Sequence, residues 1–91
     1  MSKLTSQDIK LVINSLLEMA FDAPESLAIN MSYRSILPSL YVHVYGQEYE
    51  VLMSQTVYLN DINKGLQGLL EVEAELVELI IKAKDYDEVA V

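Results

Sequence analysis

The apolar residues of this 91-residue chain change their spacing twice, and this constrains the fold more than any other feature of the sequence. From about residue 6 to 22 they recur every three or four positions, as on a helix with one apolar face. From about residue 26 to 58 they alternate with polar residues, as on strands that are buried on one side. From about residue 61 to 84 the helical spacing returns. The expected order is therefore helix, strands and helix within one domain, residues 1–91, with a frayed tail at 85–91.

Turn-forming residues divide the middle segment into three strands, at about 26–34, 39–45 and 48–58. The loop at 35–38 ends in Pro38 and sets Tyr33 opposite Leu40. Both helices and the sheet then have one apolar face each, and each of these faces needs a cover. The fold class that follows is α+β: a three-stranded antiparallel β-meander with two helices packed on one face, in the order α-β-β-β-α.

The second turn is expected at Gly46 and Gln47. Glycine adopts the positive φ that the first central position of a type II′ hairpin requires. Such a turn places His43 opposite Glu50, and Tyr41 opposite Leu52. It also leaves residues 55–59 without a partner in the meander, so that a second copy of the chain or a sharp bend would have to account for them.

The charge balance excludes several classes of partner. The chain has 14 acidic and 6 basic residues and a formal net charge of −8. Nucleic acids and anionic membranes both bind through clustered cationic side chains, which this composition lacks. No apolar run approaches the roughly 20 residues that span a bilayer. We therefore expect neither a nucleic-acid partner nor a membrane.

The sequence predicts no catalytic, metal-binding or cofactor-binding residues. It has no cysteine and a single histidine, His43, so thiolate chemistry and multi-histidine metal sites are excluded. Glu71, Glu75 and Glu78 share one side of the second helix, but no histidine accompanies them as in carboxylate metal sites. An enzyme built on His43 and Glu50 is the least favoured alternative. The absence of cysteine and of an apolar leader favours the cytoplasm.

The outer face of the expected sheet is the most informative surface. Tyrosine and arginine are enriched at protein interfaces, although tyrosine is also simply a good strand former. The candidate interface residues are Arg34, Tyr41, His43, Tyr45, Glu50, Leu52 and Tyr58.

These observations predict a non-enzymatic protein–protein interaction domain. The high apolar fraction of 52% favours a homodimer, formed through the outer sheet face or the edge of the third strand, although a different protein partner stays open. The alternative is a small acidic inhibitor, of the phage or mobile-element type, that occupies a basic nucleic-acid-binding surface on its target. The acidic residues that crowd the last third of the chain suggest this alternative.

Overall fold

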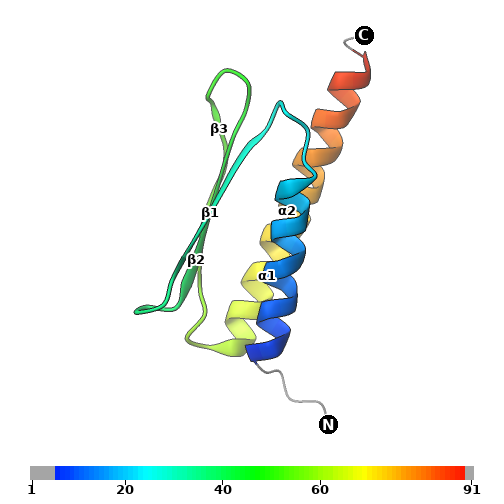
Figure 1. Cartoon of the computed structure of the whole chain (residues 1–91). Coiled ribbons are helices and arrows are strands. Elements are labelled where there is room, and N and C mark those ends of the chain that lie inside the picture. Colours follow the sequence, from blue (N-terminus) through cyan, green and yellow to red (C-terminus); the bar gives the residue numbers. More distant parts are fainter. Residues whose placement is uncertain (1–5, 90–91) are drawn as a thin grey trace.

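The computed structural model describes residues 6–89, which form two helices and three strands (Figure 1). In chain order these are α1 (Ser6–Phe21), β1 (Ala28–Arg34), β2 (Ser39–Tyr45), β3 (Val51–Tyr58) and α2 (Ile62–Val89). The strands form one antiparallel sheet in the order β1-β2-β3, and both helices lie on the same face of it. The predicted α-β-β-β-α meander is confirmed.

The two helices run side by side in the same direction. Three strands separate them in the chain, so the polypeptide returns along the sheet and enters α2 at the end where α1 begins (Figure 1). The Ser15 hydroxyl of α1 donates a hydrogen bond to Oε2 of Glu73 in α2, at 3.1 Å. Farther along, Asp22, which directly follows α1, and Lys84 of α2 line the same groove. The helices are therefore parallel, and α2 continues well beyond the end of α1.

The core lies between the sheet and the helix pair. Its fully buried side chains come from both layers, namely Leu16 of α1, Val42 and Val44 of β2, and Leu69 and Leu76 of α2. Complete burial of an aliphatic side chain of this size stabilises a fold by about 1.5–3 kcal/mol. The central strand and the two facing helix stripes therefore hold the layers together.

Helix α2 starts at a capping residue and ends later than the sequence predicts. The Asp61 carboxylate accepts a hydrogen bond from the backbone N–H of Lys64 at 3.1 Å, which satisfies one of the free donors of the first turn. The helix then continues to Val89 instead of ending at residue 84. Residues 85–89 contain no glycine or proline that would stop it. Residues 90 and 91 of the expected tail lie outside the described range.

The first hairpin has the predicted register. Tyr33 pairs with Leu40, Met31 with Val42, and so on along both strands. A loop at 35–38 of the predicted length makes this pairing possible. The loop fixed the register here because its length left only one arrangement that puts the apolar residues on one face.

The second hairpin has a different register, and the prediction for it is wrong. Leu40 lies opposite Val57 instead of Met53, which is a shift of four residues along β3. An even shift keeps the side chains from Met53 to Tyr58 on their predicted faces, because the side chains of a strand alternate. Val51, beyond the irregularity, lies opposite Tyr45 of the outer face. Residues 55–58 are consequently paired with β2, and the unpaired stretch expected there does not exist.

The physical reason for this shift is the turn, which is longer than two residues. The backbone N–H of Gly46 donates to the Glu50 carbonyl at 2.9 Å, and that of Tyr49 donates to the Gly46 carbonyl at 3.1 Å. Tyr49 has a φ of 63°, and no glycine among the described residues has a positive φ. The left-handed position that closes the turn is thus occupied by a tyrosine, which the sequence pattern did not indicate.

Candidate interaction site

The outer sheet face carries most of the candidate residues. No helix of the described chain covers it (Figure 1). Tyr41, His43 and Tyr45 alternate along β2, opposite to the buried Leu40, Val42 and Val44. Arg34 of β1 and Tyr58 of β3 both pair with Ser39, one on each side of it. These five candidates therefore share one face, as the alternation predicts.

The side chains of Tyr41, His43 and Tyr45 form a continuous aromatic row. The ring centres are 5.4 Å apart between Tyr41 and His43, and 4.5 Å apart between His43 and Tyr45. The Tyr41 hydroxyl is also hydrogen-bonded to Nδ1 of His43. Contacts of this kind fix side-chain rotamers in advance, so that less conformational entropy is lost when a partner covers them.

His43 has a further feature that matters for this face. Its Nε2 atom is buried and has no hydrogen-bond partner among the described residues. A buried polar atom without a partner costs free energy. The aromatic row therefore contains a buried polar group that no described residue satisfies.

Two predicted neighbours are not where the sequence placed them. Ser54, not Glu50, lies opposite His43, and Glu50 belongs to the turn. Tyr41 lies opposite Thr56 instead of Leu52. Leu52 falls at an irregularity where the pairing skips from Met53 to Val51, although its side chain is still exposed. Both errors follow from the two-residue turn that was assumed.

Beside the aromatic row, the outer face is hollowed. The hollow has a volume of about 350 Å³ and is lined by Ser32, Arg34, Leu37, Ser39, Tyr41, Thr56 and Tyr58. It brings together Arg34, Tyr41 and Tyr58. The prediction had grouped these residues only because the alternation of side chains along each strand puts them on the same face of the sheet. His43 and Tyr45 lie farther along β2, outside the hollow.

Two apolar residues of the first loop extend this surface, and the sequence analysis missed them. Ile36 is 95% exposed and Leu37 is 70% exposed. The signal was present, because a hairpin loop is usually polar and this one places isoleucine and leucine side by side. The outer surface therefore consists of the aromatic row, the hollow and this loop.

A second surface follows the free edge of β3. The strand pairs with β2 on one side only, and on its other side a groove of about 290 Å³ separates it from α2. The groove is lined by Gln55, Thr56, Val57, Tyr58, Lys64, Gly68, Glu71 and Val72.

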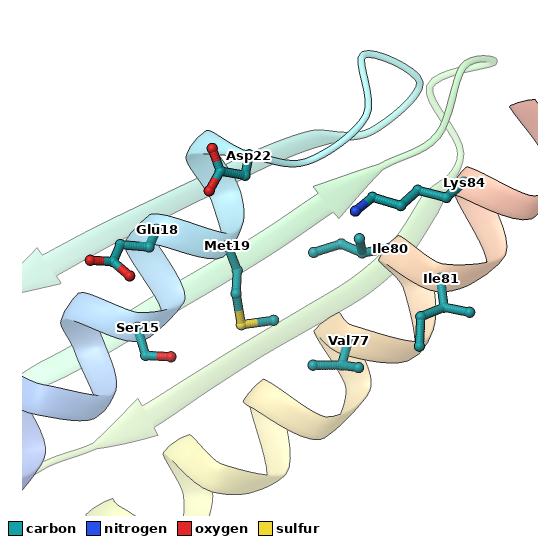
Figure 2. A pocket seen from close by; sticks show the side chains of 8 residues that line it. All are labelled: Ser15, Glu18, Met19, Asp22, Val77, Ile80, Ile81 and Lys84. Carbon is teal, nitrogen blue, oxygen red and sulfur yellow. The ribbon is translucent and has the colours of Figure 1, made fainter.

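A third surface is the groove between the two helices, on the side away from the sheet (Figure 2). Its volume is about 320 Å³. The apolar part of its lining consists of Met19, Val77, Ile80 and Ile81. The polar part consists of Ser15, Glu18, Asp22 and Lys84. Acidic and basic groups thus both border this groove.

Other kinds of site are not evident in the described part of the chain. Nowhere in it do three histidine, cysteine, aspartate or glutamate side chains come together as metal ligands would. Neither α1 nor α2 has an apolar stretch of the length needed to cross a bilayer. Comparisons with protein-family models, with curated proteins and with solved structures return no match. The functional interpretation therefore depends on the surfaces themselves.

Proposed function

We propose that this protein is a non-enzymatic protein–protein interaction domain that forms a homodimer through its outer sheet face. The observation that carries the proposal is the uncovered aromatic row of Tyr41, His43 and Tyr45, whose rings are already packed against one another. Aromatic side chains of this kind supply large contact area at low entropic cost. Two such faces stack in the manner of a β-sandwich.

The dimensions of the sheet limit the strength of this dimer. Strands of seven or eight residues at about 3.3 Å each, and three strands at about 4.8 Å spacing, give a flat area of roughly 350 Å². Stable complexes bury about 800 Å² of accessible surface per partner, so even with Ile36 and Leu37 included the contact is small. Two copies with a net charge of −8 also repel each other. We therefore expect a weak dimer with a micromolar dissociation constant.

The free edge of β3 is a less favourable place for self-association. The sequence favoured this edge because residues 55–59 were expected to have no partner strand. In the structure, residues 55–58 pair with β2. Glu71 and Glu75 of α2 lie beside this edge. Pairing of two β3 edges about a two-fold axis would bring the acidic side of each α2 toward its copy. The outer face has no such row of like charges.

Light scattering coupled to size exclusion tests the homodimer. The mass should rise from 10.3 kDa toward twice that value as the concentration increases to about 100 μM. Tyr41→Ala should move this rise to higher concentration, whereas Tyr49→Ala, which removes an exposed tyrosine from the turn, should not. A mass that stays at 10.3 kDa throughout would refute the homodimer and leave only a different protein as partner.

The acidic inhibitor is the second candidate function. Glu71, Glu75 and Glu78 are exposed along α2 and favour it, but Glu73 turns toward α1 and bonds Ser15. Binding by charge mimicry weakens steeply as salt is added, whereas association of two chains that each carry a net negative charge gains from screening. A salt titration therefore distinguishes the two functions. We also propose a cytoplasmic location, which the absence of cysteine supports.

A further inference from the structure

Strand β3 presents an unprotected edge. Its eight residues include no charged side chain and no proline, the two devices that most often keep a free edge from pairing with another chain. By comparison, the other edge strand, β1, ends in Arg34. The unpaired backbone N–H and C=O groups of an edge strand are a ready template for an added strand.

Helix α2 lies close beneath this edge and forms the floor of the adjoining groove. Gly68 makes the close approach possible, since a Cβ atom at this position would lie 2.9 Å from Cγ1 of Val57. Val57 and Val72 are buried there, and the groove between strand and helix has a volume of about 290 Å³. The close packing of Gly68 on Val57 therefore brings α2 directly beneath the β3 edge, where an added strand would lie.

The helix side of the groove is acidic. Glu71 lines it, and Glu75 lies one turn farther along, close enough for Gln55 Nε2 to donate a hydrogen bond to its carboxylate at 3.4 Å. Glu78 is exposed on the following turn. Lys64 is the one basic residue of the lining and sits at its far end, on the first turn of α2. The charge beside the edge is therefore predominantly negative, while the edge strand itself is neutral.

We propose that the β3 edge and the Glu71–Glu75 side of α2 bind an extended, basic segment of a partner protein by strand addition. The backbone of the segment pairs with β3. Its inward side chains are lysine or arginine, whose aliphatic stems lie along α2 and whose charged ends reach the two carboxylates. Its outward side chains are β-branched or aromatic and lie beside Thr56 and Tyr58. This site adjoins the outer sheet face at Thr56 and Tyr58 but does not include the aromatic row.

A synthetic octapeptide of alternating lysine and valine, capped at both ends, is a suitable probe. Its binding to the full chain is measured by fluorescence anisotropy, and the amide signals of residues 51–58 are followed by NMR. Binding should shift those signals. The Glu71→Gln, Glu75→Gln double variant should weaken binding roughly three- to thirtyfold, because two exposed charge pairs are lost. The matched double variant Glu25→Gln, Glu48→Gln removes the same charge elsewhere and should bind as the natural chain does.

Two further peptides separate strand addition from simple charge attraction. One has the same composition with the lysines and valines in two blocks. The other has N-methyl groups on alternate residues, which remove the donors along one side of the backbone. Both should bind at least tenfold more weakly. Equal binding by either peptide, or no binding of the alternating peptide up to about 1 mM, would overturn the proposal.

The outcome is independent of the homodimer. Tyr41→Ala lies on the outer face and should leave peptide binding unchanged, even where it weakens self-association. Loss of peptide binding in Tyr41→Ala, together with unchanged binding in the Glu71→Gln, Glu75→Gln variant, would place the peptide on the outer sheet face. That result would refute the proposed site at the β3 edge.

Discussion

Replacing Tyr49 with glycine should stabilise this protein, although it removes a large side chain from a strand-rich region. Tyr49 closes the turn between β2 and β3 with a φ of 63°, which is in the left-handed region. A residue with a Cβ atom pays about 1–2 kcal/mol for this conformation, and glycine pays nothing. The tyrosine side chain is 86% exposed, so that little packing is lost with it.

One effect opposes this gain. Glycine gives the unfolded chain more freedom, which lowers stability by about 0.4–1 kcal/mol. The net expectation is a gain of roughly 0.5–1 kcal/mol in the free energy of unfolding. For a domain of this size each kcal/mol corresponds to about 4–8 °C in melting temperature.

Urea denaturation followed by circular dichroism measures this difference, with Glu48→Gly as the matched control. Glu48 is exposed in the same turn but has no positive φ, so its replacement should cost about 0.5–1 kcal/mol. Gly46→Ala supplies the opposite test. A Cβ atom there meets only the flexible end of the Glu50 side chain, so stability should change by less than about 0.5 kcal/mol. A destabilising Tyr49→Gly combined with a costly Gly46→Ala would show that the turn is a two-residue type II′ hairpin and that the described register is wrong.

Three other substitutions test the packing and the helix contacts by the same denaturation assay. Val42→Ala should cost about 1–3 kcal/mol, because this side chain is fully buried at the centre of the sheet and its removal leaves a cavity; a cost below 0.5 kcal/mol would contradict the core assignment. Asp61→Ala should cost about 0.5–2 kcal/mol through loss of the α2 cap, and Asp61→Asn should restore most of it. Ser15→Ala should cost about 1 kcal/mol, because the hydrogen bond that joins α1 to Glu73 is lost, and an equal cost in a Glu73→Ala background, where no acceptor is left, would argue against that bond.

Periodicity, together with the turn-forming residues that divide the middle segment, predicted the elements and their order. The alternation from Leu40 to Val44 and the helical spacing around Leu69 and Leu76 both reflect burial, which is what periodicity reports. The first hairpin could also be paired correctly, since the loop at 35–38 left a single register that keeps the apolar residues together.

The second hairpin could not be predicted because two registers satisfy the same pattern. A shift of four residues preserves the faces from Met53 to Tyr58, so pairing Leu40 with either Met53 or Val57 places two apolar residues together. Only the conformation of the turn decides between them, and it depends on Tyr49, a residue type that seldom adopts a positive φ. The wrong turn also placed Glu50 and Leu52 at positions in the predicted site that they do not occupy. Tyr41 and His43 stayed in that site, because their positions depend only on the alternation of side chains along β2.

The parallel arrangement of α1 and α2 makes the domain electrically polar. Each helix carries a partial positive charge at its start and a partial negative charge at its end, of about half an elementary charge. In an antiparallel pair these dipoles cancel, but here they add along the long axis of the molecule. Neither helix has a basic residue in its last turn to offset the negative end. A cationic molecule that approaches the domain therefore exerts a torque on it, which turns the end where the helices finish toward the cation before any contact forms.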